Sequence, residues 1–175
     1  MNGRIIALSS IVAAALPAFA AGLAEPPGIL PELRAPAGEK PAFALQAVGV
    51  QIYTCKAGPG GYEHKWAFVA PEATLSENGA IVGHHGAGPT WESTSDKSAT
   101  KGAVKQRQDG GAGNIPWLLL AATPNGNEGR FAGVTNVQRV ATKGGVEPAG
   151  GCDAAHAGQE ARVPYTADYY FYKRS

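Results

Sequence analysis

The residues best suited to chemistry lie in one glycine-rich segment, residues 83–92. It contains His84, His85, Trp91 and Glu92. Imidazole and carboxylate groups transfer protons or bind metal ions, and an aromatic ring can stack on a flat ligand. Neighbouring strand residues point to opposite faces, so both histidines reach one site only if the strand is interrupted. We predict His85, Trp91 and Glu92 as ligand-binding residues, while a histidine pair at the surface or core edge is the simpler alternative.

The histidines and cysteines lack the spacing of a metal site. The chain has neither a His-Glu-x-x-His nor a Cys-x-x-Cys motif, and its four histidines do not recur at ligand spacing: His64, His84, His85 and His156. We therefore expect no metal ion and no cofactor.

Asp168 is a further candidate for acid–base chemistry. It lies in a strongly alternating segment, on the face opposite the apolar residues. Glycoside hydrolysis needs two carboxylates about 5–10 Å apart, and the spacing of the acidic residues selects no pair. A Gly-x-Ser-x-Gly elbow is also missing from the sequence. A small extracellular hydrolase using Glu92 or Asp168 with His84 or His85 is the alternative function, and an outward-facing acid on an edge strand is the simpler interpretation of Asp168.

The tryptophans suggest a carbohydrate-binding surface as another function. Trp66 and Trp117 fall in strand-like segments and are expected to fill the core. Trp91 follows a Gly- and Pro-rich stretch, and we predict that it is exposed and able to stack on a sugar ring.

The composition favours a folded chain without long helices. The 175 residues include 24 Gly and 13 Pro, which interrupt helices, and 44% apolar residues, which suffice for a core. The formal net charge is +1, and no basic cluster occurs. These features argue against a nucleic-acid or anionic-membrane partner.

The first 20 residues have the order of a secretory signal peptide. A charged end at Met1–Arg4 precedes the apolar run Ile5–Ala15 and a small-x-small cleavage site at Ala18–Ala20. The apolar run is shorter than the roughly 20 residues that span a bilayer. We therefore predict a signal peptide at residues 1–20, a secreted or periplasmic protein, and no membrane insertion after cleavage.

The remaining sequence predicts an extended arm followed by one β domain. Residues 21–41 contain five prolines and read as a Pro-rich N-terminal arm, with the β domain at residues 42–175. Period-two patterns and turn residues predict an all-β sandwich or barrel of seven or eight mostly antiparallel strands. The clearest strand segments are Gln46–Thr54, Tyr62–Val69, Gly79–His85, Thr90–Ser93, Ile115–Ala122, Phe131–Thr142 and Arg162–Lys173.

Several of these segments carry a prediction about their buried face. We expect Val48, Val50 and Ile52 to point inward in the first strand. In the last strand the inward set begins at Val163 and alternates to Phe171, and Pro164 places the start of that strand at an edge or strand end. Residues 106–114 are predicted to form an exposed loop.

Cys55 and Cys152 are the only cysteines in the chain. An even number in an exported protein favours a disulfide, and two buried free thiols are the alternative. Such a bridge would tie the first predicted hairpin to the segment before the last strand.

Stretches distributed from about residue 46 to the end carry a family resemblance, and they comprise residues 49–55, 66–73, 87–92, 115–119, 137–139, 142–145, 151–152 and 163–172. In these stretches the chain resembles a family of small exported bacterial and fungal proteins catalogued as a domain of unknown function. The resemblance implies export and a β-rich domain. It also predicts Asp-Gly-Ser where this chain has Asp96-Lys97-Ser98.

Some fungal members of that family are labelled malate dehydrogenase, and the sequence argues against this activity. Dinucleotide binding needs a Gly-x-Gly-x-x-Gly turn before a helix, and the nearest segment, residues 111–116, ends in proline. We expect a non-enzymatic binding or surface-associated protein whose partner is a glycan or a cell-envelope component. A purely structural envelope role is a third possibility.

Overall fold

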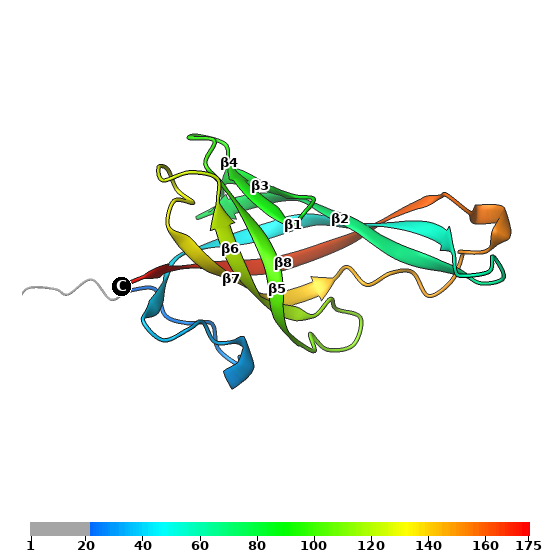
Figure 1. Ribbon diagram of the computed structural model, residues 1–175, viewed down its shortest axis with the longest axis horizontal. Coiled ribbons are helices and arrows are strands. Elements are labelled where there is room, and N and C mark those ends of the chain that lie inside the picture. Colours follow the sequence, from blue (N-terminus) through cyan, green and yellow to red (C-terminus); the bar gives the residue numbers. More distant parts are fainter. Residues whose placement is uncertain (1–21) are drawn as a thin grey trace, which may run out of the picture.

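The computed structural model describes residues 22–175, and the predicted signal peptide lies outside them. Eight antiparallel strands form one closed barrel in which each strand pairs with its neighbours in the sequence (Figure 1). The predicted all-β class is therefore confirmed, in its barrel form. The strands are β1 Glu39–Ala57, β2 His64–Glu77, β3 Ala80–Gly86, β4 Thr90–Ser93, β5 Ala99–Gln108, β6 Trp117–Pro124, β7 Val134–Gly144 and β8 Glu160–Arg174.

Helical structure is limited to two short 3-10 turns within residues 22–175. They are η1, Pro31–Leu33, and η2, Ala154–His156. No helix in this part of the chain is long and apolar enough to cross a membrane.

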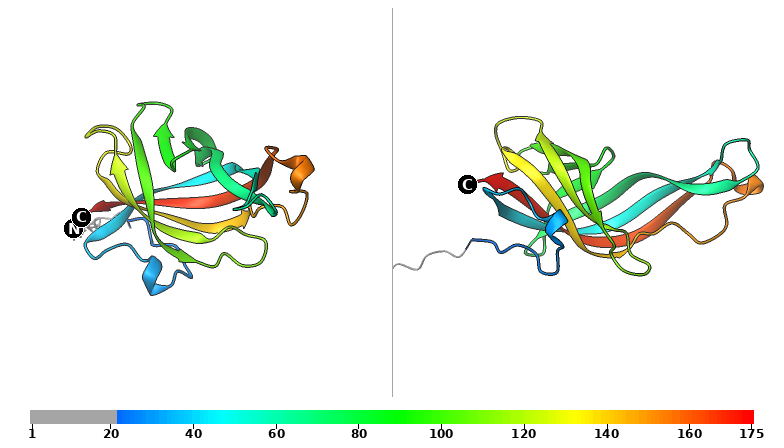
Figure 2. Two further views of the ribbon diagram at one scale, coloured as in Figure 1. Left: turned by 45° about the vertical axis from the view of Figure 1, so that its right-hand side comes forward. Right: turned by 60° about the horizontal axis from the view of Figure 1, so that its bottom comes forward.

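The first and last strands close the barrel and extend beyond it. β1 and β8 pair from Glu39 opposite Arg174 to Thr54 opposite Glu160. β7 leaves β8 at Tyr165, and β3 leaves β2 at Ala73, so the ends of β1, β2 and β8 continue as a three-stranded ribbon. This ribbon projects to the right in Figure 1 and in the right-hand view of Figure 2. Pro164 lies in the ribbon, beyond the last β7 pair, as expected for a proline at a sheet edge.

Aromatic and aliphatic side chains fill the barrel at the end opposite the ribbon. The ring of Phe43 stacks on Phe171 at 4.7 Å, and Phe131 meets Phe171 edge-on at 5.1 Å. The alternation predicted for β8 is confirmed from Tyr165 to Phe171, where the inward residues are at most 3% exposed, whereas Val163 is only partly buried and Tyr172, in the opposite set, is fully buried. Small barrels are commonly filled in this way.

The inward face predicted for β1 is wrong for Val48, whereas Ile52 is buried as predicted, at 9% exposed. Val48 is 60% exposed on the outer face, whereas Leu45, Ala47, Gln51 and Tyr53 lie inward and are at most 5% exposed. A shift of one residue exchanges the two faces of a strand, and β-branched residues suit either face. The apolar pattern therefore identified the strand correctly but, at Val48, took its outer face for the inner one.

Strand β5 was not predicted as a strand. Its sequence shows little alternation of apolar and polar residues, because it contains Lys101, Lys105 and Arg107 and has a glycine, Gly102, at an inward position. The loop predicted for residues 106–114 begins only after Gln108, where β5 ends. Gly102 lets the barrel close tightly, since a Cβ atom there would lie 2.9 Å from the ring of Trp91.

The Pro-rich segment before β1 packs against the barrel. Leu33 is fully buried, and Gln138 of β7 donates to its carbonyl oxygen at 2.5 Å. Gln108 of β5 accepts from Leu30 N at 3.0 Å and donates to Gly28 O at 3.3 Å. β1 begins at Glu39, so the residues just before position 42 already belong to the barrel.

The predicted disulfide is confirmed. Cys55, near the end of β1, is bonded to Cys152, which lies between β7 and β8, with a Cα–Cα distance of 5.3 Å. Around it, Cys55 N donates to Gln159 O and Gly158 N donates to Cys55 O, each at 2.8 Å. Trp66 Nε1 also donates to Gly150 O at 2.9 Å. The connection between β7 and β8 is therefore fastened along the ribbon.

The loop at Asp96-Lys97-Ser98 is organised by the Asp96 carboxylate. Asp96 Oδ1 accepts from Ser98 N at 2.9 Å and from Ser98 Oγ at 2.7 Å, while Oδ2 accepts from Arg130 N at 2.8 Å. These hydrogen bonds hold the pKa of Asp96 well below its ordinary value. Lys97 has a φ of +59°, in the left-handed region that favours glycine. The glycine that the family resemblance predicts at this position fits that conformation.

Candidate functional site

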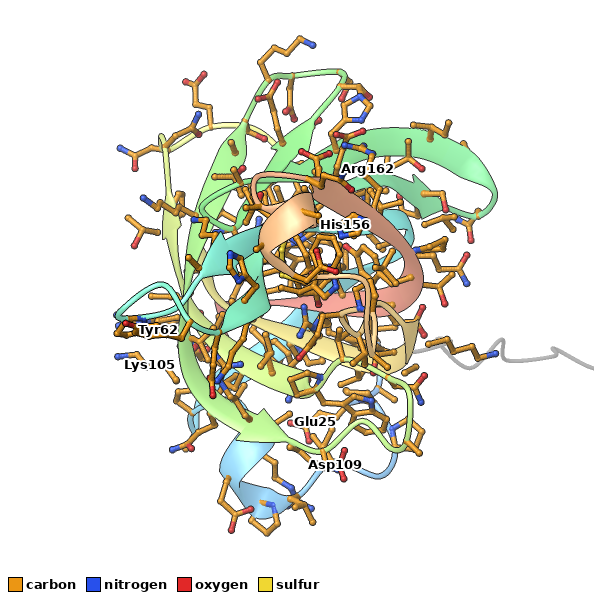
Figure 3. The ribbon with its side chains drawn as sticks, turned by 90° about the vertical axis from the view of Figure 1, so that its right-hand side faces the viewer. Glu25, Tyr62, Lys105, Asp109, His156 and Arg162 are labelled. Atoms are coloured by element: carbon orange, nitrogen blue, oxygen red, sulfur yellow. A yellow bond between two sulfur atoms is a disulfide. The ribbon has the colours of Figure 1, made fainter. Side chains whose placement is uncertain are left out.

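A cavity of about 480 Å³ lies inside the barrel, at the end from which the ribbon projects. Every strand contributes to its lining, together with the β7–β8 connection. Figure 3 views the molecule from this end, with Tyr62 of the β1–β2 loop and Lys105 of β5 labelled. The lining residues used below are Gln51, Tyr53, Phe68, His85, Trp91, Val104, Arg107, Leu118, Leu120, Arg139, Glu147 and Tyr169.

The walls of the cavity are mainly apolar and aromatic. Leu118 and Leu120 are at most 6% exposed, whereas Phe68 and Val104 are 54% and 41% exposed. The deeper wall is thus covered by the barrel, and apolar side chains also stand at the opening. Apolar walls with a few convergent polar groups are typical of small-molecule sites.

Three aromatic rings form the floor. The rings of His85 and Trp91 stack with their centroids 4.7 Å apart and their planes 8° apart. Tyr169 meets His85 edge-on at 5.0 Å and Trp91 at 5.4 Å. The side chains come from β3, β4 and β8, and the closed sheet brings them together.

The predicted exposure of Trp91 is wrong, since this residue is only 1% exposed. It lies opposite His85 in the β3–β4 pair, and both side chains point into the barrel. The flanking glycines suggested a surface loop, whereas the chain forms a tight hairpin whose second strand turns its indole inward. Trp91 therefore contacts the cavity from within the core.

His85 is neutral at physiological pH. Burial lowers its pKa to about 4, with the Arg139 charge contributing in the same direction and the Thr90 hydrogen bond opposing it. Its Nδ1 lies 2.7 Å from the carbonyl oxygen of Thr90. A carbonyl oxygen can only accept, so Nδ1 carries the proton and Nε2 keeps a free lone pair.

Several buried polar atoms around the cavity form no hydrogen bond of ordinary geometry within residues 22–175, although Gln51, Tyr165, Tyr169 and Arg139 make weaker polar contacts with one another that influence the pKa of both tyrosines. The atoms are Gln51 Nε2, Trp91 Nε1 and the hydroxyl oxygens of Tyr165 and Tyr169. Each of these residues is at most 2% exposed. Leaving a buried polar group unpaired costs about 1–3 kcal/mol. Four of the seven such side-chain atoms within residues 22–175 gather around this cavity.

Arg139 brings a positive charge to the same region. Its Nε and Nη2 atoms donate to Pro116 O at 3.1 Å and 2.8 Å. In the sheet it pairs with Leu118 and Tyr169, whose side chains also line the cavity. Burial raises the pKa of Tyr169, and the Arg139 charge acts against that rise.

Tyr53 fixes the wall beside the β7–β8 connection. Its hydroxyl donates to Gly145 O at 2.6 Å. Burial raises the pKa of Tyr53, and the nearby Glu147 carboxylate raises it further. This side chain therefore stays a neutral donor that holds one edge of the cavity.

His84 and Glu92 lie on the outer face of the barrel. They are directly opposite each other in the β3–β4 pair and line a second, more open hollow of about 660 Å³ with Glu72 and Arg162. Arg162 binds Glu72 at 2.8 Å and Glu160 at 3.2 Å. The expectation that the two histidines face opposite ways is confirmed, because His85 is buried and His84 is exposed.

Asp168 lies apart from both groups. It sits on the outer face of β8, opposite Gln46 of β1, and lines separate shallow hollows with Ser76 and Tyr170. Burial raises the pKa of its carboxyl group, and Lys143 partly offsets this. Among the predicted acid–base residues, only His84 and Glu92 are brought side by side.

The most informative lining residues were missing from the sequence prediction. Gln51 and Arg139 were overlooked because a polar residue in a strand ordinarily indicates the solvent face. A usable signal existed for Tyr169, which belongs to the inward set of the last strand. Arg139 lies two positions after the buried Val137, but irregular pairing between Val134 and Asn136 interrupts the alternation, so the pattern of this strand did not place Arg139 inside.

The fold and the cavity define a small, disulfide-linked, eight-stranded barrel whose interior pocket has an aromatic floor and a few buried polar atoms. The chain belongs to the family described as "Protein of unknown function (DUF3455)", whose model matches residues 36–173. The resemblance noted in the sequence is therefore confirmed. No curated protein and no solved structure matches the chain.

Proposed function

We propose that this is an exported binding protein whose ligand is a small organic molecule held inside the barrel. The observation that carries the proposal is the apolar cavity of about 480 Å³ with unpartnered buried polar atoms at its inner end. A ligand that supplies partners to these atoms recovers part of the free energy that their burial costs. Eight-stranded barrels are wide enough to hold one small ligand.

The dimensions of the cavity favour a compact ligand. Its volume falls in the range of about 300–1,000 Å³ found for small-molecule sites. A glycan would have to insert a single residue or a short end, because Trp91 is buried rather than displayed as a flat platform. A cell-envelope component remains a candidate partner if it carries a compact apolar group.

The hydrolase alternative has less support. His85 faces the cavity, while Glu92 and Asp168 lie on the outside of the barrel. His84 and Glu92 are neighbours on that outer face, but they share an open hollow with a paired arginine rather than an enclosed site.

Export is part of the proposal. The disulfide between Cys55 and Cys152 fits an oxidising compartment, and the first 20 residues have the pattern of a signal peptide. Fractionation of cells that produce the full chain tests this directly. A secreted or periplasmic product that begins near Ala21 supports export, and a full-length cytoplasmic product contradicts it.

Binding is tested with N-phenyl-1-naphthylamine, an uncharged dye that fluoresces in apolar surroundings. We expect saturable binding to the wild type. Val104→Trp places a bulky ring at the cavity opening and should weaken binding about tenfold or more, as expected for overpacking a fitted space. Ile81→Trp is the matched control, because Ile81 is 63% exposed and does not line the cavity. Equal binding by both variants, or none by the wild type, contradicts the proposal.

A further inference from the structure

The charged groups of the cavity are distributed unevenly between its opening and its interior. Arg107 and Glu147, of opposite charge, line the cavity with exposed side chains. Arg139 is only partly exposed and lies beside the buried Tyr169. With His85 neutral, the interior of the cavity carries the single positive charge of Arg139.

Arg139 keeps hydrogen-bonding capacity for a ligand. Two of its five N–H donors can bind Pro116 O through Nε and Nη2. Within residues 22–175 its guanidinium forms no salt bridge. The Pro116 contact fixes the guanidinium plane, and beyond a weaker polar contact with the Tyr169 hydroxyl its other donors are held in place before a ligand arrives. A fixed guanidinium suits a carboxylate or another oxyanion, which can accept two parallel hydrogen bonds.

The unpartnered polar groups near Arg139 are chiefly donors. Gln51 Nε2 and Trp91 Nε1 can only donate, and both are buried without a partner. The Tyr169 hydroxyl is kept protonated because burial raises its pKa. Acceptors on the lining are the exposed Glu147 carboxylate, His85 Nε2, the Gln51 amide oxygen and the tyrosine hydroxyl oxygens, which can also donate. The two donor-only groups, Gln51 Nε2 and Trp91 Nε1, still lack a well-formed acceptor in the interior.

We infer that the ligand is an amphipathic organic anion, whose oxyanion binds Arg139 and the neighbouring buried donors while its apolar body occupies the wall formed by Leu118, Val104 and Phe68. This inference rests on the proposed function and specifies its ligand class. A carboxylate, sulfonate or phosphate group satisfies the same donors, and an aromatic ring or an acyl chain can form the body.

A matched pair of dyes separates this inference from binding itself. N-phenyl-1-naphthylamine and 8-anilinonaphthalene-1-sulfonate share one aromatic skeleton and differ by the sulfonate group. We expect the wild type to bind the sulfonate roughly tenfold or more tightly, the scale of a charge-assisted hydrogen bond. Added NaCl should weaken binding of the sulfonate but not of the neutral dye.

Variants of Arg139 locate the charge that provides this preference. Arg139→Met should reduce the preference for the sulfonate to near unity, with the affinity of the same variant for the neutral dye as the reference. Arg139→Lys keeps the charge without the fork and should retain part of the preference. Lys105→Met is the control, because it removes an exposed positive charge from β5 without altering the lining. Melting curves confirm that each variant is folded.

The outcomes distinguish the two proposals. If both dyes bind equally and without salt dependence, the cavity binds small molecules but the anion inference is overturned. If neither dye binds, the proposed function also fails. If Arg139→Met does not fold, the wild-type dye preference, its salt dependence and Arg139→Lys still decide the inference. Competition for the sulfonate dye by sodium decanoate or by sodium 2-naphthoate then identifies an acyl or an aromatic body.

Discussion

Protonation of His85 should destabilise the protein in mild acid. The ring is 3% exposed and burial lowers its pKa from 6.5 to about 4. Between these values the unfolded chain binds a proton that the folded chain does not. The free energy of unfolding therefore falls as the pH drops from about 6.5 towards 4. Below that range His85 causes no further loss. At about 1.4 kcal/mol for each pKa unit, the loss amounts to about 3 kcal/mol.

The variant His85→Asn tests this magnitude. Its amide nitrogen can replace Nδ1 as the donor to Thr90 O, but it cannot take up a proton in this range. Loss of the stack on Trp91 should lower the free energy of unfolding at pH 7. In urea unfolding at pH 7, 6, 5 and 4, the free energy of unfolding should nevertheless fall less in this variant than in the wild type. The total loss between pH 7 and pH 4 should be smaller by about 3 kcal/mol.

A matched control separates burial from the loss of a histidine. His84→Asn changes the adjacent residue, whose ring is exposed on the outer face. Carboxylates also titrate in this range, but their contribution cancels when each variant is compared with the wild type. Parallel curves for His85→Asn and the wild type would refute the burial argument, as would an equally shallow curve for the control.

Three further substitutions test the disulfide, the β4–β5 loop and the barrel interior. Cys152→Ser opens a disulfide that joins residues 97 positions apart, and it should lower the free energy of unfolding by about 4–5 kcal/mol in the chain-entropy model; an unchanged denaturation midpoint would contradict this. Lys97→Gly relieves a left-handed backbone and should raise the free energy of unfolding by up to about 1 kcal/mol, so a clear loss in thermal or urea unfolding would count against it. Gly102→Ala forces a Cβ atom against Trp91 and should lower the free energy of urea unfolding by about 1–3 kcal/mol. Gly126→Ala, whose Cβ atom would meet open space, serves as the control. Equal effects of the two variants would show that the contact at Gly102 is not tight.

Much of the architecture follows from local patterns in the sequence. Alternation in β8 identified both the strand and its inward face, because four inward residues from Tyr165 to Phe171 are apolar or aromatic. Turn residues separated the short strands β3 and β4. The cysteine pair predicted the bond between the first hairpin and the β7–β8 connection, since an exported chain with two cysteines ordinarily pairs them.

The cavity depends on information that local patterns do not contain. Period two separates the faces of a strand without stating which one is enclosed, and this is why Val48 was placed inward. Barrel closure encloses Arg139 on β7, whereas Gln51 lies where β1 enters the ribbon and is covered by Gly145 of the β7–β8 connection. Both polar groups remain beside a space that the core does not fill. Trp91 is buried because β4 pairs between β3 and β5, a long-range arrangement that its glycine-rich flanks concealed.

The most direct test of ligand binding inside the barrel is a crystal structure of the protein with 8-anilinonaphthalene-1-sulfonate. The proposal predicts density for the dye within the cavity, with its rings against Leu118 and Phe68 and its sulfonate within hydrogen-bonding distance of Arg139. An empty cavity in crystals that hold the dye only on the outer surface would contradict the central claim.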